Sequence, residues 1–333
     1  MRDLGGGRKQ TLAKDPKIEE CFLAILKDHT AGDPQKEEVI WTDLSCTEII
    51  ERLKIQGIVV GRRIVKKLLK KHKYKKRKIM KRLSIGETTY RNEQFENIAR
   101  LKQEYKENGN PVISCDTKKK ELIGELFRSG VVYSKSEIAA FDHDFPHLAK
   151  GKAIPYGIYD LTKNSAYICI GTSHDTSEFV CDSIKKWWLE IGRHEYPNVT
   201  SILTLMDGGG SNSSRHYVFK EALQNLVTEI GVEIRIAHYP PYTSKWNPIE
   251  HRLFPHITRA MQGVILKSHL MVKELLEKTK TTTGLTVIAS IADKIYTTGK
   301  GYAEGFKKNM KIKFDEYLGK WNYRAVPTKF EKA

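Results

Sequence analysis

The sequence at positions 201–210 reads SILTLMDGGG. Its first six residues form an apolar run of strand length, and an acid and three glycines follow, which predicts a buried strand that ends at Asp207. The run VISCD at positions 112–116 has the same form and places Asp116 at the end of a second short strand. From residue 111 onward such runs alternate with helical spacing, so we predict an α/β domain whose sheet is flanked by helices.

The rest of this region is read in the same way. We expect a hairpin partner for the first strand within residues 121–133, and a mostly helical tail with a late loop over residues 265–333. Further strands are predicted at 156–161, 167–171 and 233–238, and helices at 176–192 and 214–230.

A third acid, Glu250, follows the loop PPYTSKWNP at positions 240–248. Asn247 is placed to cap the next helix, with Pro248 at its first position and Glu250 in its first turn. Each acid taken alone would be read as a turn or cap residue. Three acids at such positions, in the order strand, strand, helix, are much less expected by chance.

The three acids suggest a metal site. Carboxylates buried without partners are costly, and a divalent cation removes that cost. Mg²⁺ takes oxygen ligands, and two such ions about 3.5–4 Å apart can hold the attacking and leaving oxygens of a phosphodiester. We therefore predict Asp116, Asp207 and Glu250 as metal ligands and catalytic residues. The glycines at 208–210 would let a bulky backbone approach, and Lys118, Lys119 and Lys120 would hold flanking phosphates.

Other clusters are given simpler interpretations. Asp142, His143, Asp144 and His147 have a metal-like composition, but we read them as a loop because Phe145 and Pro146 interrupt them. The segment 174–178 is read as a helix start, and the serines at 211, 213 and 214 as caps of the next helix.

The charge of the chain is concentrated near its N-terminus. The formal net charge is +17. Residues 1–50 hold 7 Lys and Arg against 10 Asp and Glu, a net of −3, whereas residues 51–100 hold 17 against 4, a net of +13. A segment this basic indicates a polyanionic partner; nucleic acid is the usual one, and an anionic membrane surface is the alternative.

Residues 30–44, which contain Gly32 and Pro34, are read as a loop. The basic segment that follows has the pattern of a helix-turn-helix. Ser45 and Glu48 form a capping-box start, the pair at 56–57 makes the turn, and a second helix begins near Gly61. Residues 61–82 contain 13 Lys and Arg, and no acid occurs between Glu51 and Glu87. The DNA-binding residues predicted on the second helix are Arg62, Arg63, Lys66, Lys67, Lys70 and Lys71.

Cysteine usage and hydropathy bear on the compartment. The five cysteines form no CxxC pair, so a structural zinc site is not expected. There is no signal peptide and no apolar run of membrane-spanning length. We expect a cytoplasmic protein that does not enter a membrane.

Several longer runs resemble those of the Rhodopirellula-type DDE transposases of bacterial insertion sequences. The resemblance covers nearly the whole chain. The runs that carry it are SCDTKKKE at 114–121, KAIPYGIYD at 152–160, DGGGSN at 207–212, TSKWNPIEHRLF at 243–254, TTTGLTV at 281–287 and KWNY at 320–323.

The resemblance implies an RNase H-like catalytic domain, dependence on Mg²⁺ with Mn²⁺ as a substitute, and cleavage and joining of DNA strands at element ends. It places the family's three carboxylates on Asp116, Asp207 and Glu250. The implied partners are the terminal inverted repeats and target DNA in the bacterial nucleoid, with a homo-oligomer to pair two ends. The expected organisation is a flexible lead at 1–16, an all-α helix-turn-helix DNA-binding region at 17–89, a connecting helix at 90–110, the catalytic domain at 111–265 and a helical extension at 266–333.

Relatives usually carry another helix-turn-helix ahead of the GGGRK run found here at 5–9, so we expect this chain to begin inside the family pattern. Two alternatives stay open: an inactive DNA-binding remnant or regulator, and an RNase H-like nuclease that cuts without joining. Terminal inverted repeats in the DNA around the gene would favour the transposase.

Overall fold

The computed structural model describes residues 15–33, 36–77, 89–212 and 214–328. The chain divides into two compact units, residues 1–83 and 84–333. The expected flexible lead at 1–16 lies outside the described residues except for its last two positions. None of the described helices is both long and apolar enough to cross a membrane.

The N-terminal unit is built on three helices, α2 (Lys17–Asp28), α3 (Cys46–Ile55) and α4 (Arg62–Lys71), which share one apolar core. The Ser45 hydroxyl accepts the Glu48 N–H at 3.3 Å, and the Glu48 carboxylate accepts the Ser45 N–H at 2.7 Å. This reciprocal pair confirms the predicted capping box at the start of α3. The fully buried side chains of this core are Phe22, Ile49, Leu53, Val65 and Leu68.

An antiparallel pair of strands, β1 (Thr30–Asp33) and β2 (Lys36–Thr42), lies between α2 and α3. The predictions of a loop over 30–44 and of an all-α N-terminal region are therefore wrong. The glycine that favoured the loop, Gly32, lies inside β1 where the register shifts before Asp33. A glycine at such a position is typical of a bulge within a strand.

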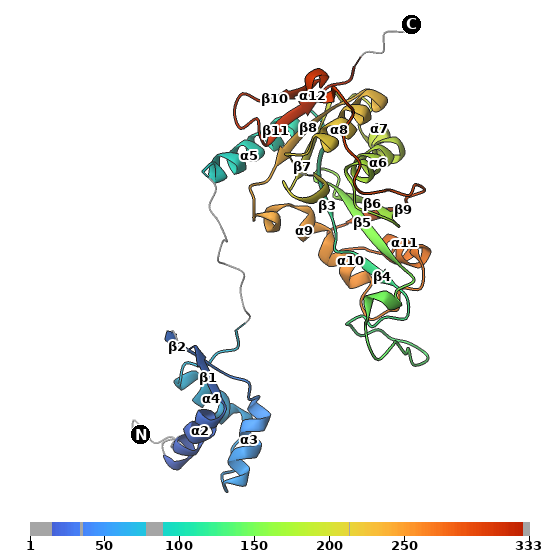
Figure 1. Ribbon diagram of the computed structural model, residues 1–333. Helices are drawn as coiled ribbons and strands as arrows, with labels where there is room; N and C mark the ends of the chain where they lie inside the picture. Colours follow the sequence, from blue (N-terminus) through green and yellow to red (C-terminus); the bar gives the residue numbers. More distant parts are fainter. Residues whose placement is uncertain (1–14, 34–35, 78–88, 213, 329–333) are drawn as a thin grey trace, which may run out of the picture. The chain divides into compact units, whose positions relative to one another are not determined.

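The C-terminal unit is built on a nine-stranded mixed sheet (Figure 1). Its strands are β3 (Val112–Thr117), β4 (Glu121–Ile123), β5 (Gly151–Asp160), β6 (Ser165–Gly171), β7 (Ser201–Met206), β8 (Glu233–His238), β9 (Thr286–Ile291), β10 (Ile312–Phe314) and β11 (Asn322–Ala325). They lie in the order β10-β11-β8-β7-β3-β5-β6-β9, with β4 beside β5. β3, β7 and β8 are parallel to one another, β6 is parallel to β9, and the other pairs are antiparallel.

Helices cover both faces of this sheet. On one face α6 (Ser177–Trp187) and α8 (Tyr217–Ile230) pack over the central strands. The other face carries α5 (Arg91–Glu107), α9 (Ile249–Arg252), α10 (Phe254–Ala260) and α11 (His269–Glu277). The short helices α7 (Arg193–Glu195) and α12 (Phe306–Asn309) complete the unit.

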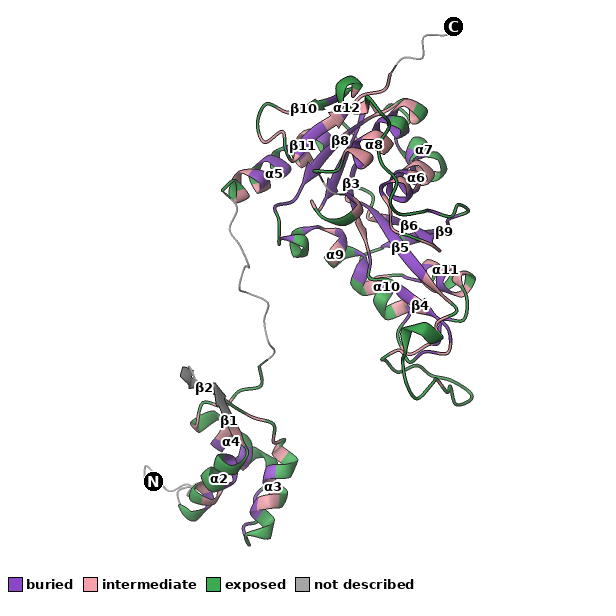
Figure 2. Ribbon diagram, in the orientation of Figure 1, coloured by how far each residue is buried: buried purple, intermediate pink, exposed green. Residues whose placement is uncertain are grey.

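Because both faces are covered, the central strands are buried along their length, as the purple ribbon in Figure 2 shows. In β7, Ile202 and Met206 face the core beneath α6 and α8, while Leu203 and Leu205 face α5. The structure is thus the α/β, RNase H-like mixed sheet flanked by helices that the resemblance implies.

Two expectations about the catalytic region are corrected. The hairpin expected within 121–133 does not form: β3 takes β5 as its antiparallel partner, and only Glu121–Ile123 forms a strand, also beside β5. The extension expected to be helical over 266–333 contributes three strands, β9, β10 and β11, to the same sheet. β10 and β11, of three and four residues, are too short to produce a clear periodic signal.

Helix α5 also has a larger role than the connecting helix expected at 90–110. Its residues Leu101 and Tyr105 are buried against Val112 of β3 and Leu203 of β7. This helix is part of the core of the C-terminal unit, which begins at residue 84 rather than 111.

Candidate active site

Asp116 and Asp207 lie at the ends of neighbouring parallel strands. β3 pairs with β7 with Ser114 opposite Leu205. The same register two residues further sets Asp116 opposite Asp207, so both acids lie at the carboxyl edge of the sheet. The two strand ends predicted from the sequence are therefore neighbours in the sheet.

Glu250 is brought toward this edge by hydrogen bonds between its loop and β3. The Ser114 hydroxyl donates to Oδ1 of Asn247 at 2.5 Å, and Nδ2 of Asn247 donates to the Cys115 carbonyl at 3.4 Å. The Ile249 N–H donates to the Ser114 hydroxyl at 3.1 Å. Ser114 and Asn247 are both fully buried, so α9 is fixed to the strand that carries Asp116.

Asn247 therefore does not cap α9 as expected. Pro248 occupies the N-cap position, and the helix has no side-chain cap. The side chain of Asn247 is used instead for the contact with β3, at a sequence separation of 133 residues from Ser114.

The three acids affect one another electrostatically. Burial and the negative charges of Asp207 and Glu250 raise the pKa of Asp116 to about 8. Burial also raises the pKa of Asp207. The pKa of Glu250 is raised by burial first and by the charge of Asp207 as well. Each shift means that the ionised form lacks enough positive charge nearby to balance its burial.

In residues 15–33, 36–77, 89–212 and 214–328, no three His, Cys, Asp or Glu side chains are arranged to hold a metal ion. The structure brings the three acids to one edge without closing them into a ligand set. Like charges that are not neutralised repel, and this repulsion opposes closure. The donors are nevertheless of the kind that Mg²⁺ and Mn²⁺ take, since carboxylate oxygens suit both ions.

The raised pKa of Asp116 predicts a pH-dependent stability. Its pKa is about 8 in the folded chain against about 3.9 when unfolded. The folded chain thus holds a proton that the unfolded chain releases, so the free energy of unfolding falls as pH rises from about 4 to about 8. Without divalent cations, Asp116→Asn should raise the Tm above that of the wild type at about pH 8.5, and this gain should vanish near about pH 4. Calorimetry at both pH values checks this, and an equal gain at both would contradict the assigned cause.

The glycines after Asp207 leave open space beside the acid. A Cβ added at Gly208 or Gly210 would meet no atom within 4 Å, and Gly210 has a φ of +57°, which favours glycine. The Gly209 N–H donates to the Asp207 carboxylate at 3.4 Å. The backbone at 208–210 therefore carries no side chains, and no other atom crowds Gly208 or Gly210.

Asp175 is a residue that the sequence analysis assigned only to a helix start. Its carboxylate accepts the Ser211 hydroxyl at 2.9 Å, and the Ser177 hydroxyl donates to the Ser211 carbonyl at 2.9 Å. Its charge also contributes to the raised pKa of Asp207. Ser211 therefore binds α6 and its N-terminal loop instead of capping α8, whose N-cap, His216, makes no side-chain cap; Ser213 lies outside the described residues.

A hollow of about 730 Å³ adjoins Glu250. Thr117 and Lys119, which follow Asp116 in the sequence, line this hollow together with Thr258 and Gln262. The hollow is open and partly polar, and it lies beside the carboxyl edge of the sheet.

Lys118 is expected from the sequence to contact a phosphate, but its ammonium is already engaged within the protein. Its ammonium donates to the Glu121 carboxylate, which also accepts the Arg128 guanidinium at 2.5 Å. Burial raises the pKa of Glu121, but the hydrogen bonds from Lys118 and Arg128 outweigh it and hold that pKa below its usual value. Lys118 is 8% exposed, whereas Lys119 and Lys120 are exposed and retain the expected role as candidates.

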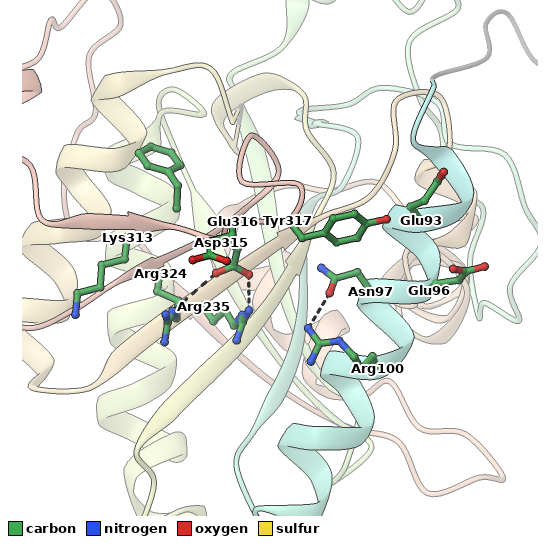
Figure 3. Close-up of a pocket in the computed structure, with 11 residues that line it drawn as sticks. Glu93, Glu96, Asn97, Arg100, Arg235, Lys313, Asp315, Glu316, Tyr317 and Arg324 are labelled. Carbon is green, nitrogen blue, oxygen red and sulfur yellow. Dashed lines mark hydrogen bonds and ion pairs between the residues drawn. The ribbon is translucent and has the colours of Figure 1, made fainter.

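A second hollow, of about 910 Å³, lies between α5 and the β10–β11 hairpin (Figure 3). Asp315 pairs with Arg235 and, at 3.9 Å, with Arg324, and Oδ1 of Asn97 accepts Arg100 at 2.9 Å. None of the three catalytic candidates lines it. Because it is remote from these candidates and Asp315, Arg235 and Arg324 are paired within its wall, we assign it no part in the chemistry.

The six basic residues predicted to bind DNA lie on α4. Val65 and Leu68 are fully buried beneath it, and the six basic side chains are exposed. Lys71 forms an ion pair of 2.6 Å with Glu19 of α2. The predicted continuation of the basic run at Lys78, Lys81 and Arg82 lies outside the described residues.

Comparison with solved structures finds remote likenesses. A Mos1 transposase paired-end complex with the left transposon end is 15% identical with a TM-score of 0.39, and covers 83% of this chain and 74% of its own. A mariner Mos1 paired-end complex with Mg is 14% identical with a TM-score of 0.42, and the match covers 83% of this chain and 75% of that chain. Comparison with curated proteins gives no significant match.

The sequence model of one family matches almost the whole chain. The match extends over residues 22–327 and includes every predicted catalytic residue. It also includes α5 and the strands β9 to β11, which agrees with their place in the C-terminal unit. The chain belongs to the family described as the Rhodopirellula transposase DDE domain.

Proposed function

We propose that this transposase cleaves DNA at the ends of an insertion sequence and transfers the freed 3′-hydroxyl into target DNA. The main support for this proposal is the position of the three acidic residues, Asp116, Asp207 and Glu250. Asp116 lies near the end of β3 and Asp207 follows the neighbouring parallel strand β7. Asn247 ties the helix of Glu250 to the strand that carries Asp116. The alternatives are a nuclease that cuts without joining and an inactive DNA-binding protein.

Asp116, Asp207 and Glu250 would hold Mg²⁺, with Mn²⁺ as a substitute. Bound there, the cation supplies Lewis-acid stabilisation of charge on the phosphate and favours ionisation of the attacking hydroxyl or water. The three carboxylates are ionised in that state, since positive charge lowers the pKa values that burial raises.

The surrounding residues would position the DNA. The glycines at 208–210 would allow the sugar-phosphate backbone to approach Asp207, because they carry no side chains. Lys119 and Lys120 would contact phosphates on either side of the reacting bond, without reading the base sequence.

The N-terminal unit would provide most of the DNA affinity. We propose that residues 45–82 form a helix-turn-helix surface and that α4 presents Arg62, Arg63, Lys66, Lys67, Lys70 and Lys71 to DNA. Phosphate contacts of this kind dominate affinity but carry no sequence information by themselves. Since two element ends must be paired, we expect the protein to act as a homo-oligomer on DNA in the bacterial cytoplasm.

One assay separates the three functions. A linear DNA carrying the gene with its flanking sequence is incubated with the full-length protein, Mg²⁺ and a supercoiled target plasmid. Cleavage at the borders of inverted repeats followed by covalent joining to the plasmid supports the transposase. Cleavage without joined product points to a nuclease, and binding without cleavage points to an inactive protein.

A further inference from the structure

The loop that follows Asp207 is tied to the protein near both of its ends. At its start, Nδ1 of His238 lies 2.9 Å from the Asp207 carbonyl. At its far end, the buried ammonium of Lys220 donates to the Ser214 carbonyl. The Asp207 side chain projects from a backbone that is therefore held from β8 and from α8.

Both ties meet at Tyr323 of β11. The Tyr323 hydroxyl lies 3.0 Å from Nε2 of His238, and Nζ of Lys220 lies 5.3 Å from the centroid of the Tyr323 ring. A carbonyl oxygen only accepts, so Nδ1 of His238 carries a proton and donates it to Asp207. With the ring neutral, Nε2 is the acceptor, and the Tyr323 hydroxyl donates to it.

We propose that Tyr323 is a positioning residue for the metal site, acting on Asp207 through His238. This rests on the proposed function, because it concerns how Asp207 is held to bind a divalent cation. Tyr323 fixes the plane and the tautomer of the imidazole, and the imidazole fixes the Asp207 carbonyl. Direct hydrogen-bond partners of metal ligands commonly contribute about 10–100-fold to metal affinity or activity. Tyr323 acts one step further out, through His238, so we expect the lower end of that range.

A purely structural role for Tyr323 is the competing explanation, because the side chain is fully buried in the main core. The two roles are separable, since Tyr323→Phe keeps the ring, its packing and its contact with Lys220 but removes the hydroxyl. Tyr105→Phe is the matched control. Tyr105 is also buried, and its hydroxyl is 2.7 Å from Ser201, at the opposite end of the strand that leads to Asp207.

The experiment compares the full-length wild type with both variants in two assays that need no DNA cleavage. Hydrogen exchange is followed by mass spectrometry in peptides covering residues 207–214, and Mn²⁺ binding is measured by calorimetry on the DNA-free protein. Tyr323→Phe should accelerate exchange in this loop and raise the Mn²⁺ Kd by about tenfold. Tyr105→Phe should leave the Mn²⁺ Kd within about twofold of the wild type, even where its Tm falls by a similar amount.

The outcomes are distinct. An unchanged Mn²⁺ Kd in Tyr323→Phe, or an equal change in both variants, would overturn the positioning role. If the wild type binds no Mn²⁺, the metal site itself fails, and unchanged exchange in Tyr323→Phe would then also reject the tie to the loop. If Mn²⁺ binds as expected but the wild type neither cuts nor joins DNA, the proposed function fails while the role of Tyr323 stands.

Discussion

Asp116→Ala, Asp207→Ala and Glu250→Ala should each slow DNA cleavage in Mg²⁺ by roughly 10⁴-fold, because carboxylates that hold metal together fail as a unit. Combining two of the substitutions should add little to one, since the remaining acids no longer form a working site. Initial rates on end-labelled DNA, with protein in excess, measure this loss directly.

DNA affinity should change little in these three variants, because the lysines that would bind phosphates are not substituted. Removing a negative charge beside DNA should raise the affinity slightly rather than lower it. Gel-shift titrations of the same preparations check this. A Glu250→Ala variant that still cuts at the wild-type rate would remove Glu250 from the mechanism and favour a site built on the two aspartates.

Asp160→Asn provides a matched control for these variants. Asp160 is also a buried acid of the main sheet, but it pairs with Ile113, toward the end of β3 remote from Asp116. Its carboxylate accepts the Tyr196 hydroxyl at 2.7 Å and the backbone N–H groups of the turn that follows it. This substitution should lower the Tm and leave the cleavage rate of the folded protein unchanged.

The acids at strand ends could be predicted because the strands that carry them are buried on both faces. Such strands are continuous apolar runs, and the polar residue that ends each run marks the edge of the sheet. Residues 201–206 and 233–238 form the strands expected of them. The short strands β10 and β11 could not be found in this way, because three or four residues carry too little periodicity.

The residues that support the acids were not predictable from local pattern. Asn247 fits a helix cap by type and position, and only the fold shows that its side chain bonds to Ser114. Lys118 belongs to a run of three lysines, and only the fold shows that Glu121 and Arg128 draw it into a buried ion-pair network. Such contacts depend on which distant segments meet, and a single sequence does not state that.

The second large effect is expected on DNA binding. Replacing Lys66, Lys67, Lys70 and Lys71 together by alanine should weaken binding and reduce its dependence on salt. Each lost phosphate contact lowers the slope of log K against log salt by about 0.9 for duplex DNA, so four lost contacts lower it by up to about 3.6. The fall in affinity between about 50 and 200 mM salt should then be smaller by roughly 10²-fold.

The core beneath α4 should survive this change. Val65 and Leu68 hold the helix, and alanine is the best helix-forming residue, so the substitutions leave its buried side intact. The ion pair of Lys71 with Glu19 is half-exposed and contributes little to stability. Circular dichroism and the Tm of the variant test whether the fold is kept.

The matched control for charge replaces four exposed lysines of the C-terminal unit, Lys307, Lys308, Lys311 and Lys313, by alanine. Both variants lose four positive charges, so both lose the same amount of long-range attraction to DNA. If the effect comes from contacts made by α4, only the first variant shows the large fall in salt slope. An equal fall in both variants would mean that net charge, not a surface on α4, determines binding. The helix-turn-helix assignment of residues 45–82 would then lose its support, because its basic face would be one contribution among many.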